Sequence, residues 1–374
     1  MHFFAGGSYL QETKKGLEGI VALDTSISFI DGMQGILKYR GIDIEHLAEM
    51  SYETISYLLI NGILPGEQEL AAYSNRLKSE RRINGEMIDI MRVCNYGTEA
   101  LDSLRTAISC TAHMDHENDN NSLDANKNKA VRLIAKLPTM IAALYRCKSG
   151  DFPFQPDETL SHGANFLYML RGEAPSAIEA EAIEKDFILS AEHELNPSTF
   201  ALRIAASTLA DVYSAIITGL CTLKGPLHGG ARRGVMEMLD EVAVPENANN
   251  YVLYKLSRKE KIMGFGHRVY RTYDPRSRIF KDMAKRVAKE NGDPTWYEVA
   301  ESLEHVMYRE FLDVRGRPIY PNVDFYSAVI YKYLRIPPEL ATSVFAIGRV
   351  SGWTAHCFEQ YADNRVIRPR AHYI

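Results

Sequence analysis

The sequence contains no apolar run long enough to cross a membrane, although the chain has 374 residues. Its most apolar stretch, residues 205–223, is interrupted by Asp211, whereas a transmembrane helix needs about 20 apolar residues. The first seven residues lack the basic start and the long apolar core of a secretory signal peptide. We therefore expect a cytoplasmic protein without a membrane span.

Cysteine is scarce, and the common cofactor and metal motifs are missing. The five cysteines are widely spaced and form no CxxC pair, which indicates thiols in a reducing compartment rather than a disulfide scaffold. No P-loop is present, and Val269 occupies the place of the third glycine in a would-be dinucleotide fingerprint at Gly264 and Gly266. His113 and His116 lack the helical HExxH spacing, so we expect a solvated acidic loop there and no metal site.

The chain has little excess charge, with 43 basic and 48 acidic residues. A net charge of −5 argues against a protein that binds polyanions over its whole surface. Residues 256–289 are the exception, because eleven basic residues stand there against three acidic ones. This segment predicts a site for an anionic ligand with several charges. A solvated helix face, or a module that grips nucleic acid, is the alternative interpretation.

The pattern that is present predicts a mostly helical, all-α protein with a few small N-terminal β-hairpins. Short strands are expected at residues 20–23, 26–30 and 36–39, whereas the rest of the chain has helical periodicity, including one apolar helix over residues 199–220. There is no βαβ alternation, internal repeat or linker rich in Pro and Ser. We therefore expect a second domain to be an excursion from the first.

Three turns, two of them rich in glycine and the third beginning at Pro321, each present one acid–base residue on a loop, where catalytic residues are often found. These residues are His228, His267 and Asp324. A lone histidine beside glycines is usually a cap or a core residue, and spacing alone does not show that the three meet. With several arginines, however, they form a set suited to removing a proton next to a carbonyl and joining the carbanion to an anionic carbonyl compound.

These turns, in order with further motifs, resemble the citrate synthase family over about 350 residues. The other matching segments are residues 16–22, 39–44, 193–200, 273–276, 348–356 and 364–369. The resemblance implies an almost entirely helical homodimer, with a large domain formed by residues 1–228 and 328–374. Residues 229–327 would form a small domain that closes over the substrates and binds CoA.

The resemblance also implies the reaction and its residues. The chain would condense acetyl-CoA with oxaloacetate, as in the tricarboxylic acid cycle, without a cofactor and without nucleic acid or membrane as a partner. Asp324 would take the methyl proton, His228 would stabilise the enol, and His267 would polarise the ketone. The implied oxaloacetate-binding residues are His193, Arg276, Arg349 and, from the neighbouring subunit, Arg368. The implied CoA-binding residues are Lys261, Met263, Gly264, Phe265, Gly266 and Arg271.

The chain departs from the family pattern at two places. Arg232 and Arg233 replace the usual Asn-Glu pair, which predicts altered contacts and added positive charge near CoA. Pro197 replaces a more usual alanine and is expected to stiffen the turn that carries His193. The same machinery also serves 2-methylcitrate synthase, which uses propionyl-CoA. The sequence leaves the choice of acyl group open.

Overall fold

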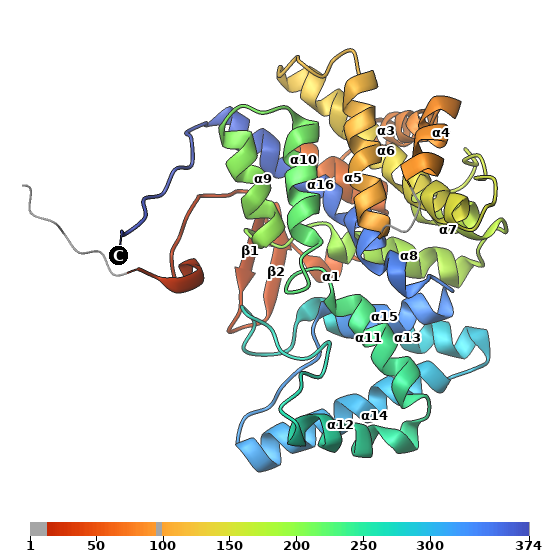
Figure 1. Cartoon of the computed structure of the whole chain (residues 1–374), viewed down its shortest axis with the longest axis vertical. Helices are drawn as coiled ribbons and strands as arrows, with labels where there is room; N and C mark the ends of the chain where they lie inside the picture. Colours follow the sequence, from red (N-terminus) through yellow and green to blue (C-terminus); the bar gives the residue numbers. More distant parts are fainter. Residues whose placement is uncertain (1–12, 95–98, 374) are drawn as a thin grey trace, which may run out of the picture.

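The computed structural model describes residues 13–94 and 99–373, and these form an almost entirely helical molecule (Figure 1). The strands are β1 Ser28–Asp31, β2 Ile36–Tyr39 and β3 Ile42–Asp43. The short helical elements are η1 Lys15–Leu17, η2 Pro245–Asn247, η3 Glu310–Val314 and η4 Pro338–Leu340. The α-helices are α1 Ile44–Leu47, α2 Tyr52–Asn61, α3 Glu67–Glu80, α4 Gly85–Cys94, α5 Ala100–Met114, α6 Leu123–Lys148, α7 His162–Arg171, α8 Ala177–Ser190, α9 Pro197–Ser207, α10 Val212–Leu223, α11 Ala231–Val242, α12 Ala248–Ser257, α13 Pro275–Asn291, α14 Thr295–Arg309, α15 Val323–Tyr333 and α16 Ala341–Ala362. This confirms the predicted fold class.

The strands form one small antiparallel sheet in the order β1-β2-β3, with Ser28 opposite Tyr39 and Tyr39 opposite Ile42. The predicted hairpin is therefore confirmed. The strand predicted at residues 20–23 is wrong, because this segment has extended backbone without a partner strand. Ile20 and Val21 are exposed, so the apolar run forms no packed sheet.

Helix α16 is the centre of the core. It contacts α2, α6, α8, α9 and α10, and its side chains are buried around almost its whole circumference, including Trp353 and Val350. A helix that is surrounded by other helices in this way must be apolar on every side. The residues of α16 that carry charge, such as Arg349, are therefore costly to bury and call for a functional explanation.

The prediction of a single helix over residues 199–220 is wrong. This segment forms parts of two antiparallel helices, α9 and α10, with a turn between them. Each helix has its own side-chain N-cap: Asn196 accepts from the backbone N–H of Thr199, and Asp211 accepts from that of Ser214. Caps of this kind satisfy backbone donors that a helix start leaves unpaired. Pro197 occupies the first helical turn of α9, where a missing N–H is harmless.

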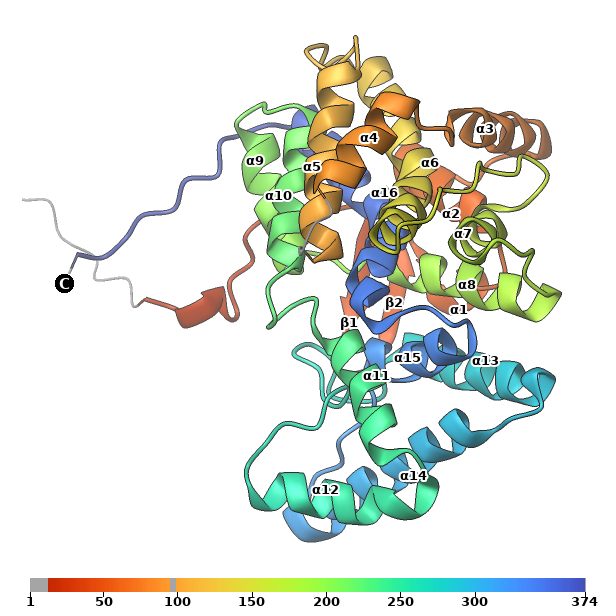
Figure 2. The ribbon, with the colours of Figure 1, turned by 45° about the vertical axis from the view of Figure 1, so that its right-hand side comes forward.

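Helices α11 to α15 gather in the lower half of the molecule, and the earlier helices and α16 form the upper half (Figures 1 and 2). In the lower half α11 and α13 both pack on α15, and α12 packs on α14. Helix α13 also contacts α8 of the upper half. Both halves therefore meet beside α15, whose first turn carries Asp324.

No helix in the described part of the chain is long and apolar enough to cross a membrane. The expected absence of a signal peptide concerns residues 1–7, which lie outside the described residues. After α16 the chain runs beside α9, where the backbone N–H of Ile367 donates to Ser207 Oγ, and then leaves the body (Figures 1 and 2). Arg368 is exposed on this segment.

Candidate active site

His228 lies on the turn between α10 and α11. Its Nε2 is 2.9 Å from Oγ of Ser198, which stands in the first turn of α9. Burial, and then the positive charge of Arg349, lower the pKa of His228 to about 4. The imidazole is therefore neutral at pH 7 and has one N–H to donate.

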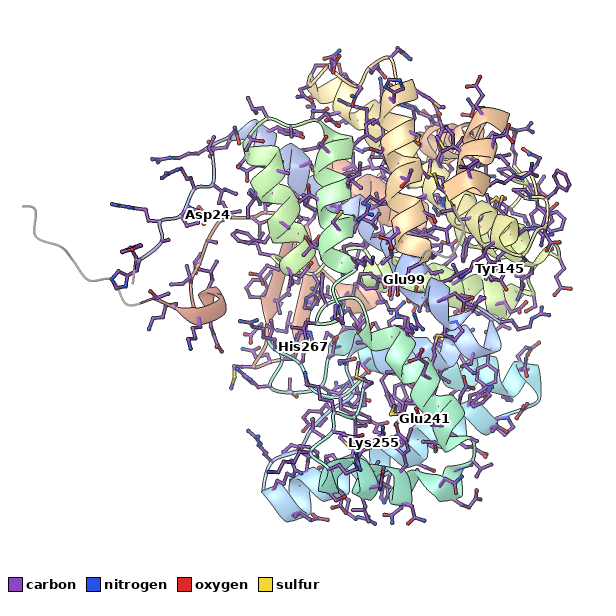
Figure 3. All side chains as sticks on the ribbon, viewed as in Figure 1. Asp24, Glu99, Tyr145, Glu241, Lys255 and His267 are labelled. Carbon is purple, nitrogen blue, oxygen red and sulfur yellow. The ribbon has the colours of Figure 1, made fainter. Side chains whose placement is uncertain are left out.

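His267 lies on the loop between α12 and α13, near the level where the two halves of the molecule meet (Figure 3). Its Nδ1 accepts hydrogen bonds from the backbone N–H groups of Val269 and Tyr270, at 2.9 and 3.1 Å. Burial, and then the charge of Arg276, lower the pKa of His267 to about 4. A neutral ring whose Nδ1 accepts must carry its proton on Nε2, so His267 presents a donor.

Asp324 lies in the first turn of α15. Its backbone N–H donates to the side chain of the N-cap residue Asn322. The Asp324 carboxylate keeps about 20% of its side-chain surface exposed, and its Oδ1 accepts from Nε of Arg232 at 3.3 Å. Asp324 is thus a fixed and accessible carboxylate.

The loops of His267 and Asp324 are joined by hydrogen bonds. Asn322 donates from its backbone N–H to the carbonyl of Gly264 at 2.8 Å and from Nδ2 to the carbonyl of Gly266 at 3.1 Å. The N–H of Gly266 donates to the carbonyl of Tyr320 at 2.9 Å. The ring of Phe265 packs on Phe325, with centroids 4.6 Å apart. Both loops therefore form one local unit.

Two buried arginines and a third histidine lie beside His267. The rings of His193 and His267 are 5.3 Å apart between centroids, and burial, followed by the charge of Arg276, lowers the pKa of His193 well below its ordinary value. Arg276 forms a two-point ion pair with Asp274, whose carboxylate raises the arginine pKa although burial opposes it. Arg349 donates from Nε to the carbonyl of Ser190 at 2.6 Å.

Arg349 has no carboxylate within ion-pair distance among the described residues. Burial lowers its pKa to about 10, and the neighbouring charges of Glu192 and Asp324 only partly offset this effect. Its charge also acts on His228. Arg349 is thus a buried cation whose charge interacts with both His228 and Asp324. Such a cation suits the carboxylate of a ligand.

A cavity of about 720 Å³ opens beside these groups. His228 and His267 both line it, as do Asn322 of the Asp324 turn and the predicted CoA-binding residues Lys261, Met263, Gly264, Phe265 and Gly266. Arg271 is exposed and is not among the residues that line the cavity. Its backbone N–H donates to the carbonyl of Gly32.

Seven of the eleven basic residues in the segment 256–289 fall into two groups. Four of its charges are neutralised by carboxylates, in the pairs Arg258–Glu260, Arg276–Asp274, Lys281–Glu304 and Arg286–Glu181. Lys259, Lys261 and Arg268, together with Arg315 from further along the chain, line the cavity. The observations therefore favour the interpretation as a pocket for an anion over that of a surface for nucleic acid.

Four residues of the site were not predicted from the sequence. Ser198 contacts His228, and Asp274 pairs with Arg276. Arg268 and Arg315 line the cavity. Asp274 had a visible signal, since an N-cap two residues before a predicted binding arginine can reach that arginine. Ser198 had none, because its contact with His228 joins two turns thirty residues apart.

The expectation of added positive charge from Arg232 and Arg233 is wrong, since neither adds free positive charge near the cavity. Arg232 is buried and paired with Asp186 and Asp324. Arg233 is exposed and pairs with Glu237 one helical turn away.

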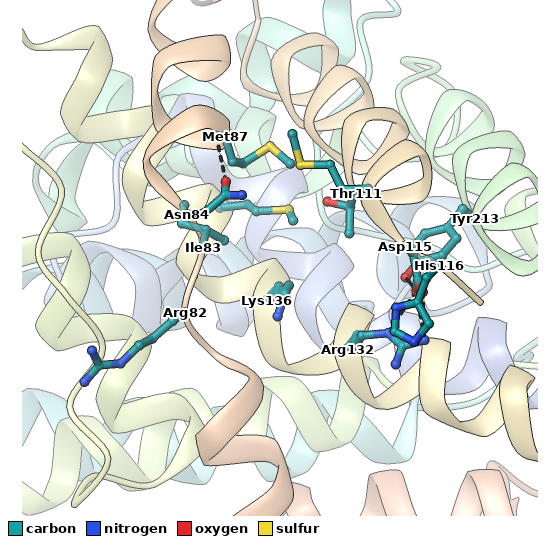
Figure 4. Close-up of a pocket in the computed structure, with 12 residues that line it drawn as sticks. Arg82, Ile83, Asn84, Met87, Thr111, Asp115, His116, Arg132, Lys136 and Tyr213 are labelled. Carbon is teal, nitrogen blue, oxygen red and sulfur yellow. Dashed lines mark hydrogen bonds and ion pairs between the residues drawn. The ribbon is translucent and has the colours of Figure 1, made fainter. Parts of the chain in front are cut away.

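A second cavity of about 240 Å³ lies between α4, α5 and α6 (Figure 4). Neither His228 nor His267 lines it. Its cations are already paired: Arg132 binds Asp115 and Glu117, and Lys136 binds Glu80. The acidic loop after His113 is thus an ion-pair cluster. Within the described ranges no group of three or more His, Cys, Asp and Glu side chains is arranged to hold a metal ion.

Comparisons with known proteins agree with this geometry. Residues 16–370 match the family model described as citrate synthase, C-terminal domain. The chain is 46% identical to citrate synthase 2 of Bacillus subtilis over 96% of this chain and 95% of the relative. It is 38% identical to the citrate/2-methylcitrate synthase of the same organism over 97% of each chain.

Solved structures give the same result. The citrate synthase of Pyrobaculum aerophilum superimposes with a TM-score of 0.90 at 38% identity, covering 96% of this chain and 92% of that one. A citrate synthase from Thermoplasma acidophilum, solved in a ternary complex with carboxymethyl coenzyme A and oxaloacetate, gives a TM-score of 0.89 at 34% identity, covering 97% of this chain and 96% of that one.

Proposed function

The chain belongs to the citrate synthase family, and from this premise we propose that His228, His267 and Asp324 carry out its chemistry. Its activity is that of a citrate synthase, a transferase that condenses acetyl-CoA with oxaloacetate. The observation that carries the residue assignment is the convergence of three turns on one cavity. His228 and His267 line this cavity, and the Asp324 turn is hydrogen-bonded to the His267 loop.

Oxaloacetate binds where the buried cations lie. Arg349 receives one substrate carboxylate, since no protein carboxylate pairs with it within the described ranges. Arg276 and His193 complete this side of the pocket, and Nε2 of His267 donates to the ketone oxygen. A donor aimed at an oxygen that becomes negative stabilises the transition state more than the ground state.

Acetyl-CoA binds on the opposite side, along residues 261–266. Asp324 removes a proton from the acetyl methyl group while His228 donates a hydrogen bond to the thioester oxygen, which gives an enolate stabilised by that hydrogen bond. The enolate carbon attacks the ketone carbon of oxaloacetate, and His267 gives its proton to the ketone oxygen. Water then hydrolyses citryl-CoA to citrate and CoA. Acid–base groups of this kind contribute about 10²–10⁴-fold each, and holding two substrates in contact contributes much of the rest.

The acyl substrate is acetyl-CoA, and the 2-methylcitrate alternative is not favoured because relatives of higher identity are named citrate synthase. One methylene is worth about 1–3 kcal/mol in a pocket, so propionyl-CoA will be a poorer second substrate. The test is thiol release from acetyl-CoA and propionyl-CoA in the presence of oxaloacetate. A higher kcat/KM with propionyl-CoA would overturn this assignment, and no release with either would overturn the activity.

The chain divides into a large domain of residues 1–228 and 328–374 and a small domain of residues 229–327 that closes over the substrates. Support comes from the gathering of α11 to α14 in one half of the molecule, with the cavity beside their junction. Closure excludes water from the enolate. Small-angle scattering should show a smaller radius of gyration when oxaloacetate is added, and an unchanged radius would contradict closure.

The enzyme works as a cytoplasmic homodimer in which Arg368 completes the neighbouring site, and it uses no cofactor. Support comes from the exposure of Arg368 on a segment that leaves the body of its own chain. Mixing inactive Arg368→Ala and Asp324→Asn chains should restore activity, because a mixed dimer contains one intact site. Mixed dimers without activity would contradict a shared site.

A further inference from the structure

Arg232 occupies a position where the family usually has asparagine, and it is one of the most deeply buried charged side chains in the described chain, with 1% of its surface exposed. It stands in the first turn of α11. From there its guanidinium reaches Asp186 of α8 and both Asp324 and Tyr331 of α15. A single side chain thus connects three helices beside the carboxylate proposed as the base.

The charge of Arg232 is balanced by Asp186 rather than by Asp324 alone. Nη1 donates to Oδ1 of Asp186 at 2.7 Å and to the hydroxyl of Tyr331 at 2.6 Å, and that hydroxyl donates to the other oxygen of Asp186 at 2.6 Å. Asp186 is completely buried, and although burial raises its pKa, the charge of Arg232 opposes this. This closed triangle neutralises the arginine and leaves its Nε for another acceptor.

The orientation of the guanidinium is fixed by aromatic rings as well. Its carbon lies 4.9 Å from the ring centroid of Tyr331 and 5.2 Å from that of Phe345. Cations over aromatic faces are attracted by the ring quadrupole, most strongly where water is absent. With Nη1 held by the triangle and the plane held by two rings, Nε points in one direction only.

That direction is toward Asp324. Nε lies 3.3 Å from Oδ1, whereas no hydrogen bond between described residues reaches Oδ2. The backbone of Asp324 is held at the same time by Asn322. The carboxylate is therefore fixed by one oxygen and open at the other, the arrangement that a base needs if one oxygen is to face its substrate.

We propose that Arg232 is a positioning residue for the base, holding Oδ1 of Asp324 so that Oδ2 faces the acyl methyl group. This inference rests on the proposed function of Asp324. An asparagine at this position would be too short to reach Asp186 and Asp324 together, whereas the guanidinium of Arg232 contacts both. The role concerns proton abstraction and not the binding of oxaloacetate.

The test compares Arg232→Asn with the matched control Arg233→Asn, which lies next to it on α11 but is exposed. For Arg232→Asn we expect kcat to fall about 10–100-fold, the usual cost of misplacing a reacting group by about 1 Å. KM for oxaloacetate should stay within about twofold, because binding in the ground state is unchanged. Arg233→Asn should match the wild type.

The isotope effect distinguishes positioning from a merely structural role. With methyl-deuterated acetyl-CoA, the kinetic isotope effect on kcat should be larger in Arg232→Asn than in the wild type, since proton abstraction becomes more fully rate-limiting. Guanidinium ion at non-denaturing concentration should partly restore kcat to Arg232→Ala, whereas sodium ion should not. A global folding defect would be rescued by neither.

Removing Arg232 leaves Asp186 buried without its partner, which destabilises the fold. If the single variants do not fold, the double variant Asp186→Asn/Arg232→Asn removes both charges, and the same loss of kcat and the same larger isotope effect are expected. A kcat within about twofold of wild type, or an unchanged isotope effect, overturns the proposal. Wild-type enzyme without thiol release would instead overturn the proposed function itself, and the inference with it.

Discussion

Nε2 of His228 lies 2.9 Å from Oγ of Ser198. The same hydroxyl lies 2.7 Å from Oδ1 of Asn196, and it has only one proton to donate. If the hydroxyl donates to the imidazole, the neutral ring of His228 carries its proton on Nδ1 and can donate to a thioester oxygen. If it donates to Asn196, the proton stays on Nε2 and Nδ1 can only accept. The donor role proposed for His228 therefore requires the first arrangement, in which the hydroxyl of Ser198 donates to Nε2.

Replacing Ser198 with alanine should lower kcat about tenfold, in keeping with the loss of one hydrogen bond worth about 1 kcal/mol or slightly more. KM for oxaloacetate should not change, since Ser198 contacts only the acetyl side of the site. Ser343→Ala is the control, because Ser343 is buried on α16 without a hydrogen-bond partner for its hydroxyl in the described chain. Equal kcat values for the two variants would contradict this arrangement.

Asp324→Asn should lower kcat about 10²–10⁴-fold, because the amide cannot accept the methyl proton. The fold should persist, since Arg232 keeps its pair with Asp186. Calorimetry should show wild-type affinity for oxaloacetate, and thiol release measures the loss of turnover. Near-normal turnover would show that another group is the base.

Arg349→Met should raise KM for oxaloacetate about 100-fold, corresponding to the roughly 3 kcal/mol lost when one partner of a buried charge pair is truncated. The same change should raise the melting temperature of the ligand-free enzyme, because it removes a buried cation that lacks a paired carboxylate. Arg335→Met is the control, since Arg335 is exposed and pairs with Glu173 at the surface. Unchanged KM for oxaloacetate would exclude Arg349 from the substrate site.

His162 should make the enzyme sensitive to acid. Both of its ring nitrogens are buried without a partner among the described residues, and burial, with a smaller effect of Arg81, lowers its pKa well below 6.5. Below pH 6.5 the unfolded chain binds a proton here that the folded chain does not. The free energy of unfolding therefore falls as the pH drops from 6.5 toward the folded-state pKa, by at most about 1.4 kcal/mol per pH unit for this group.

His162→Phe should remove this contribution, since the ring packs between Tyr52 and Phe187 and phenylalanine keeps these contacts. Urea titrations at pH 7 and pH 5 measure the effect, and the stability difference between the two pH values should be smaller in the variant. His193, His228 and His267 keep their own acid sensitivity, so some pH dependence will remain. Identical pH dependence in both proteins would refute the assignment to His162.

The fold class was predictable because helical periodicity and capping residues are local properties of the sequence. Asp274 is a visible cap before Pro275, and the structure confirms that it begins α13. The wrong predictions arose where local pattern competes with packing. Residues 20–23 have the composition of a strand but find no neighbour, and residues 199–220 have a continuous apolar pattern that turns back on itself at Leu209, which has a positive φ of 62°.

The candidate site was predictable only through recognisable turns. Glycines around His228 and His267, and Pro321 and Asn322 before Asp324, marked the loops, but only the tertiary structure shows which groups support them. Arg232 and Asp324 are 92 residues apart in the sequence, and no local pattern in either segment predicts their contact. The sequence also does not show which of the two adjacent arginines, Arg232 or Arg233, is buried and which is exposed.

The hydrogen bonds between the His267 loop and the Asp324 turn have a consequence for how the enzyme cycles. Because Asn322 ties its own turn to Gly264 and Gly266, the proposed base and the proposed ketone-side donor would move together during the proposed closure. Their spacing would then be preserved while the pocket opens and closes, and product release would not require the reactive geometry to be rebuilt at each turnover.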